Sequence, residues 1–182
     1  GKRNYSLEFD GTDDKVVVTD NANLDFTGDF SISAWVSRAA SGGYQIVSKT
    51  NDGTSGGYAM LICSAGELYC RTNNGTSSND SYTATGLIPA DSTWHHATIV
   101  RSGTSCAVYV DAINRTSTAA THTTLTANAL DLTIGTRPNA GGEFWSGKID
   151  DARVYNYALT AAQVKSIMND GAIRRGPATG AP

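Results

Sequence analysis

The sequence is poor in charged side chains and has no long apolar run. Charged residues make up 17% of the 182 residues, below the roughly one quarter that is typical of soluble domains. The longest apolar stretch, 58–63, is far shorter than the roughly 20 residues of a membrane span, so we expect no membrane insertion. The net charge is −3, and the sequence contains no Lys/Arg run. Both observations argue against nucleic acid as a partner.

Paired carboxylates of the kind that cleave glycans are also missing. A retaining glycosidase holds two carboxyl groups roughly 5–5.5 Å apart, but only Glu8 among the three glutamates has an acidic residue two positions away. His95 and His96 follow a tryptophan at the start of an expected strand, where packing and hydrogen bonding are the expected roles. His122 lies in a threonine-rich segment with no predicted partner. We therefore predict that the chain is not an enzyme.

Cysteine is scarce, and the three cysteines form no zinc pattern. If Gly66 and Glu67 are the central residues of a type II′ hairpin turn, Cys63 and Cys70 lie opposite each other and a disulfide can join them. Such a bond predicts an oxidising compartment. The alternative is that both are small apolar residues in a strand pair. Cys106 is expected to be a buried filler.

Short alternating or β-branched runs recur between polar turns, as in 30–36, where every second residue is apolar. We predict strands at 5–9, 15–19, 30–36, 44–49, 58–63, 68–72, 94–101, 106–111, 130–135 and 148–155. The segment 73–82 is expected to be a long polar loop. Many short strands without helix alternation predict an all-β fold, a two-sheet antiparallel jelly-roll sandwich.

One short C-terminal helix is predicted after Thr160. Thr160 and Gln163 form a capping box, the following apolar residues recur at helical spacing, and Gly171 stands where a C-terminal cap is expected. The remaining segment, 172–182, has no apolar period, so we predict one domain over 1–171 followed by a tail or linker.

Acidic residues gather near both ends of the chain. They are Asp10, Asp13 and Asp14 in a glycine-containing turn, and Asp150 and Asp151 in a late strand. Calcium takes six to eight oxygen ligands, and these two segments supply them if the terminal strands pair. Alternatively, Asp10 and Asp13 bond the amides of their own turn, and Asp151 pairs with Arg153.

Several segments together resemble the laminin-G-like, concanavalin A-like jelly-roll domains. They are 7–16, 30–36, 94–97, 108–111, 147–156 and 158–164, in this order. The resemblance implies two stacked antiparallel sheets, one of them concave, with the terminal strands side by side. It also implies a structural calcium ion at the rim, for which the family pattern selects Asp150 to join Asp10 and Asp13.

The resemblance further implies a lectin-like carbohydrate-binding or adhesion module that is secreted or displayed at a surface. Sugars stack on aromatic rings and bond polar side chains, so the candidate ligand residues are Tyr82, Arg137, Asn139 and Phe144. The expected partner is a glycan or a protein surface, within a larger multidomain or multimeric assembly. The alternative function is a structural display domain of a virion, an appendage or a cell surface.

Overall fold

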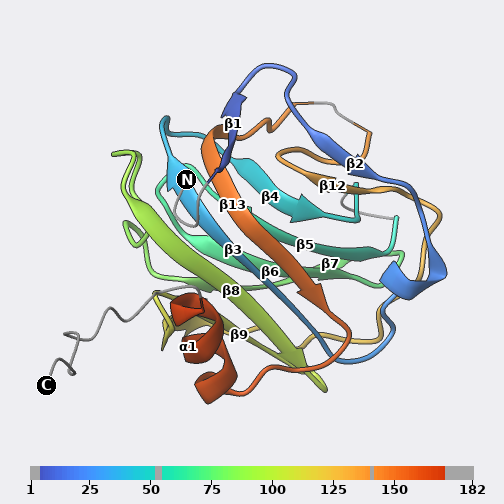
Figure 1. Cartoon of the computed structure of the whole chain (residues 1–182). Coiled ribbons are helices and arrows are strands. Elements are labelled where there is room, and N and C mark those ends of the chain that lie inside the picture. Colours follow the sequence, from blue (N-terminus) through green and yellow to red (C-terminus); the bar gives the residue numbers. More distant parts are fainter. Residues whose placement is uncertain (1–4, 52–54, 140–141, 171–182) are drawn as a thin grey trace, which may run out of the picture.

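The computed structural model describes residues 5–51, 55–139 and 142–170, which form two stacked antiparallel sheets and one α-helix (Figure 1). The six-stranded sheet has the order β1 (Leu7–Asp10), β13 (Ser146–Tyr155), β3 (Phe30–Arg38), β8 (Trp94–Ser102), β9 (Ser105–Val110), β10 (Ile113–Asn114). The seven-stranded sheet has the order β11 (Thr116–Thr118), β7 (Ser78–Thr83), β6 (Leu68–Asn73), β5 (Gly57–Ile62), β4 (Tyr44–Ser48), β12 (Leu132–Ile134), β2 (Val16–Val18). The predicted all-β jelly-roll sandwich is confirmed.

The core lies between the two sheets and follows the predicted alternation. On β3, the inward side chains of Phe30, Ile32, Ala34 and Val36 are fully buried. The opposite face of this central strand is buried too, and there Trp35 packs edge-on against a histidine ring of β8. β3 lies between β13 and β8 in the interior of its sheet, and both of its faces are buried.

The first and last strands lie side by side, as the resemblance implies (Figure 1). β1 pairs antiparallel with β13, so that Leu7 faces Ile149 and Asp10 faces Ser146. β13 pairs with β3 on its other edge. The two ends of the domain are therefore joined by backbone hydrogen bonds.

The predicted helix is α1 (Ala161–Asn169), and its capping box is present. Thr160 accepts from the amide of Gln163, whose side chain accepts in return from the amide of Thr160. Val164 of α1 packs on Val100 and Tyr109, on the outer face of the six-stranded sheet. Gly171 and the predicted tail at 172–182 lie outside the described residues. Among the described residues, the helical segments are too short and too polar to cross a membrane.

The prediction of a loop over 73–82 is wrong for most of that segment. Residues Ser78–Thr83 form β7, which pairs with β6 from Asn73 to Tyr69. The strand lacks an apolar alternation because its buried side chains, Ser81 and Thr83, are polar and form hydrogen bonds in the interior. The predicted pattern depends on an apolar inner face, which this strand does not have.

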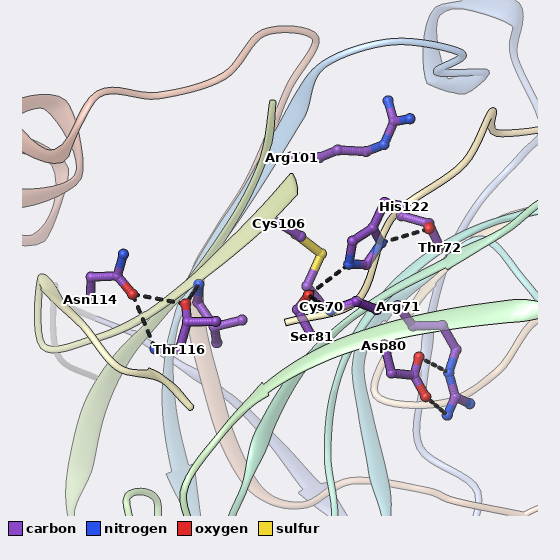
Figure 2. The surroundings of a disulfide bond; sticks show 12 residues. Cys70, Arg71, Thr72, Asp80, Ser81, Arg101, Cys106, Asn114, Thr116 and His122 are labelled. Atoms are coloured by element: carbon purple, nitrogen blue, oxygen red, sulfur yellow. Dashed lines mark hydrogen bonds and ion pairs between the residues drawn. A yellow bond between two sulfur atoms is a disulfide. The ribbon is translucent and has the colours of Figure 1, made fainter. Parts of the chain in front are cut away.

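The predicted Cys63–Cys70 disulfide is also wrong. β5 and β6 are joined through residues 63–67, and the register places Cys70 opposite Met60. Cys70 therefore points into the core, where it is bonded to Cys106 of β9 with a Cα–Cα distance of 6.4 Å (Figure 2). Cys63 is a free thiol. The bond links the two sheets across the core instead of closing one hairpin.

A buried histidine lies against this disulfide (Figure 2). His122 is fully buried, and its Nδ1 and Nε2 atoms lie 2.8 Å from the hydroxyls of Thr72 and Ser81. Burial, with a smaller contribution from the charge of Arg101, lowers the pKa of His122 to about 4. Because both neighbouring sulfurs are in the disulfide, no thiolate joins His122 as a metal ligand.

We expect the domain to lose stability between about pH 6.5 and pH 4 through His122. The unfolded chain binds a proton near the ordinary histidine pKa of 6.5, whereas the native side chain binds one only near 4. The difference between these two pKa values corresponds to about 3 kcal/mol of folding free energy. This contribution is fully present above pH 6.5 and is lost as the pH falls to about 4. The free energy of unfolding, measured with urea across this pH range, should fall less steeply with decreasing pH for His122→Gln than for the wild type. Parallel slopes would contradict the assignment.

Candidate functional site

The outer faces of the two sheets are covered by different segments. Helix α1 covers part of the outer face of the six-stranded sheet, over β8 and β9 (Figure 1). No helix within the described residues packs on the outer face of the seven-stranded sheet. Outward side chains of β6 and β7 are half-exposed on one side of this sheet, whereas those of its central strand β5, Ala59 and Leu61, are buried.

Two aromatic rings and an ion pair stand next to each other on β6 and β7. Tyr69 and Tyr82 are cross-strand partners with ring centroids 4.5 Å apart and nearly parallel planes. Two residues along, the guanidinium of Arg71 donates two hydrogen bonds of 2.8 Å to the carboxylate of Asp80 (Figure 2). The outer face therefore combines a flat apolar surface with fixed donors and acceptors.

The free thiol borders the same aromatic pair. The side chain of Cys63 forms a hydrogen bond with the hydroxyl of Tyr69. Burial raises the pKa of Cys63 and also that of Tyr69. Both groups therefore remain protonated near neutral pH, and the tyrosine hydroxyl stays a neutral donor and acceptor.

A second ion pair stands farther across this face. Arg137 binds the carboxylate of Glu143 through two nitrogens, and the side-chain amide of Gln45 on β4 donates to the same carboxylate at 2.7 Å. Burial by itself would raise the pKa of Glu143, but the bonds from Arg137 and Gln45 outweigh it and lower the pKa. Arg71 lowers it further, so the two ion pairs are electrostatic neighbours.

The structure brings two of the four predicted ligand residues to this face. Tyr82 lies in the aromatic pair, and Arg137 lies in the second ion pair. Asn139 follows in the same loop, exposed, with its amide donating to the side chain of Asn51. Phe144 is half-buried next to a fully buried tryptophan. Sequence reasoning missed Tyr69, Arg71 and Asp80, which become recognisable only when β7 is paired with β6.

The acidic turn after β1 gathers three carboxylates. Asp10, Asp13 and Asp14 are exposed, and one oxygen from each lies within 4.8 Å of the others. Asp14 accepts from the amide of Asp10, and Asp10 accepts from the amide of Thr12. Backbone bonding by the turn, expected as an alternative, is thus present for Asp10, and the clustered oxygens remain of the kind that calcium prefers.

Asp150 does not join this cluster. Asp10 faces Ser146, so Asp150 lies four residues farther along β13, about 13 Å at roughly 3.3 Å per residue. Asp150 faces Trp35 on the next strand instead. The neighbouring Asp151 accepts from Arg153 at 2.7 Å, as the alternative predicted.

A buried lysine holds two loops together at the rim. The side chain of Lys49, at the end of β4, is 1% exposed. Its Nζ lies 2.6 Å from Asp20 Oδ1 and 3.1 Å from Asp25 Oδ1. It also donates to the carbonyls of Asn128 at 3.0 Å and Leu130 at 2.7 Å. The ammonium is therefore enclosed by oxygens from the loop before β3 and from the segment before β12.

His95 also takes part in a polar network, but the network fixes a turn. Nδ1 of His95 lies 2.9 Å from Asp111 Oδ2, and Nε2 lies 3.1 Å from the hydroxyl of Thr93. That hydroxyl donates to Asp91 at 2.6 Å, so its proton is not directed at the histidine. Asp111 also accepts the amide of His96. The expected role of these histidines in hydrogen bonding and packing fits this arrangement.

The sequence matches one protein family over most of its length. The profile described as the Concanavalin A-like lectin/glucanases superfamily, with the family name Laminin_G_3, matches residues 10–165. A comparison with curated protein sequences finds no match.

Solved structures share the fold at low sequence identity. The binding domain of Paraclostridial Mosquitocidal Protein 1 is 18% identical with a TM-score of 0.70, over 92% of this chain and 44% of that chain. A structure of botulinum neurotoxin type C, whose cell entry depends on interaction with two ganglioside molecules, is 16% identical with a TM-score of 0.64. The match covers 86% of this chain and 40% of that chain. A heptameric SAP-like pentraxin from Limulus polyphemus is 20% identical with a TM-score of 0.66, over 92% and 83%. The chain thus spans less than half of the toxin domains.

Replacing Lys49 with methionine should strongly destabilise the domain. The substitution leaves the carboxylates of Asp20 and Asp25 facing each other without a cation, and breaking a buried ion pair costs about 3–5 kcal/mol. The control is Lys148→Met, whose lysine is half-exposed and lies 3.9 Å from Glu8; it should cost less than about 1 kcal/mol. Urea unfolding gives both values, and equal costs would contradict a structural role of the Lys49 cluster.

Proposed function

The chain belongs to the concanavalin A-like lectin/glucanase superfamily, and we propose that it is a non-catalytic extracellular module that binds carbohydrate. The ligand surface is the outer face of the seven-stranded sheet. The observation that carries the proposal is the stacked Tyr69–Tyr82 pair next to the Arg71–Asp80 ion pair.

The chemistry of this face suits a sugar. An aromatic ring offers a flat apolar surface, and a tyrosine adds a hydroxyl at its end. Charged donors and acceptors form the stronger hydrogen bonds, and here the bidentate pair of Arg71 and Asp80 holds them in a fixed geometry. A second polar group, formed by Arg137 and Glu143, extends the surface for a longer chain of sugar units.

The same pairs support a binding role over a catalytic one. Glycan cleavage requires one carboxylic acid whose pKa is raised so that it donates a proton. On this face, the carboxylate of Asp80 is engaged by Arg71, and the pKa of Glu143 is lowered by its bonds to Arg137 and Gln45 despite its burial. Neither is suited to be the proton donor.

The comparisons supply further support for the ligand class and the location. Among the structures of similar fold, one is described as a toxin that interacts with gangliosides and another as a toxin domain in complex with synaptotagmin II. A glycan, or else a protein surface, is therefore the ligand class that we propose. The Cys70–Cys106 disulfide suits an oxidising compartment, in keeping with a secreted or surface-displayed protein that mediates adhesion.

A structural display domain is the second candidate function. β2 is an edge strand whose Val17 and Val18 are about half-exposed, and exposed edges pair readily with other chains. The similar pentraxin is heptameric. A stable multimer in light scattering, together with no glycan binding, would favour this function over the first.

We also propose a structural calcium ion at the acidic turn. The three carboxylates of Asp10, Asp13 and Asp14 offer the oxygen donors that calcium prefers, in one exposed cluster. Asp150 lies too far along β13 to be a ligand of the same ion. When bound, the ion would neutralise the mutual repulsion of the three carboxylates and hold the turn after β1.

Removing the Tyr82 ring of the aromatic pair should abolish most of the glycan affinity. We expect Tyr82→Ala to bind at least about tenfold more weakly than the wild type on a glycan array and in calorimetry, because it loses the stacking surface. The matched control is Tyr157→Ala, since Tyr157 is also partly exposed but lies by α1. Wild-type binding by Tyr82→Ala, or equal losses in both variants, would contradict the proposed surface.

Calcium should raise the melting temperature of the wild-type domain by several degrees over its value in chelator. Saturation at about 100 times the dissociation constant adds about 2.7 kcal/mol, and a domain of this size gains roughly 2–4 °C per kcal/mol. The double variant Asp13→Asn, Asp14→Asn should lose this response, and the control Glu8→Gln on the adjacent strand should keep it. An identical melting temperature of the wild type in calcium and in chelator would refute the site.

A further inference from the structure

A polar pocket opens at the rim of the sandwich, away from the aromatic pair. Its volume is about 450 Å³, within the roughly 300–1,000 Å³ of small-molecule sites. It is formed by the loop between β2 and β3 together with the residue that follows β13. The lining includes Asn23, Asp25, Phe26, Thr27, Asp29 and Asn156.

The loop that forms the pocket is fixed at three points by groups outside it. The carboxylate of Asp25 pairs with the buried Lys49 at 3.1 Å. The carbonyl of Gly28 accepts from the buried guanidinium of Arg101. The carboxylate of Asp29 accepts the amide of Gly103 at 2.7 Å. A site whose shape is set before binding loses less conformational entropy when a ligand enters.

The pocket also holds polar side chains that the fold does not use. Within the described residues, the side chains of Asn23, Thr27 and Asn156 make no hydrogen bond, so their amides and hydroxyl are available. Phe26 borders the pocket, but it is a core residue that is 9% exposed, and its ring stacks on Phe30 and Tyr58. The lining therefore offers polar side chains that can bond the hydroxyls of a ligand.

The charge of the pocket selects the class of ligand. Asp25 and Asp29 are the charged residues of the described lining, which contains no lysine, arginine or histidine. The nearest cations, Lys49 and Arg101, are buried and already donate to oxygens of the fold. An anionic ligand would meet repulsion without a compensating cation, and such repulsion is a source of specificity.

We infer that this rim pocket is a second binding site, which takes a short neutral saccharide. The side chains of Asn23, Thr27 and Asn156 bond the sugar hydroxyls, and the free oxygens of Asp25 and Asp29 accept from them. The site goes beyond the proposed function, because it is separate from the aromatic pair and needs neither Tyr69 nor Tyr82.

Saturation-transfer NMR and calorimetry with the whole chain test the site. The probes are galactose, glucose, mannose and N-acetylglucosamine, with N-acetylneuraminic acid as the anionic comparison. We expect at least one neutral sugar to bind and the anionic sugar not to bind at this pocket. Asn156→Ala and Asn23→Ala should each weaken the neutral sugar about tenfold, whereas Asn169→Ala on α1 should leave it unchanged.

The outcomes separate this site from the sheet surface. Loss of the neutral sugar in the two pocket variants, with retention in Tyr82→Ala, supports the pocket. Loss in Tyr82→Ala alone overturns the pocket and leaves the sheet surface as the single sugar site. Failure of every neutral sugar to bind the wild type also overturns the pocket, whatever the glycan array gives for the sheet surface.

Discussion

The Cys70–Cys106 bond between the sheets decides which side chains of β6 face outward. Because successive strand residues point to opposite faces, a Cys70 that is fixed in the core places Tyr69 and Arg71 outside. A slip of one residue would turn both of them inward. β7 pairs with β6 in register, so Tyr82 follows from the same constraint. The composition of the candidate sugar surface therefore depends on one covalent bond in the interior.

The interior behind that surface is polar, and three of its polar side chains bond one another. Thr72, Ser81 and His122 are buried and bonded to one another, and buried polar groups that are satisfied in this way define one packing arrangement. The opposite sheet is packed differently, since α1 covers its outer face with apolar side chains. The domain thus has one covered face and one face with functional groups, with the rim pocket at the edge between them.

Much of the fold followed from the sequence because most strands have apolar inner faces. The alternation of 30–36 predicted the central strand, and the capping box of Thr160 and Gln163 predicted the helix. Two features did not follow. β7 buries Ser81, so its pattern resembles a loop, and the disulfide joins β6 and β9, which lie in different sheets and are 36 residues apart in the sequence. Of the candidate site, Tyr82 and Arg137 were predicted, but their neighbours depend on the pairing of β7 with β6.

The ammonium of Lys49 occupies a ring of oxygens at the rim, a position that a bound metal ion takes in many other loops. A metal ion in such a ring of oxygens is held by mass action, so its occupancy falls when the free ion is scarce. The charge of Lys49 is attached to the backbone directly after β4 and cannot diffuse away. The two loops that it joins are therefore held by a charge of the chain itself, and their cross-link at the border of the pocket needs no divalent ion.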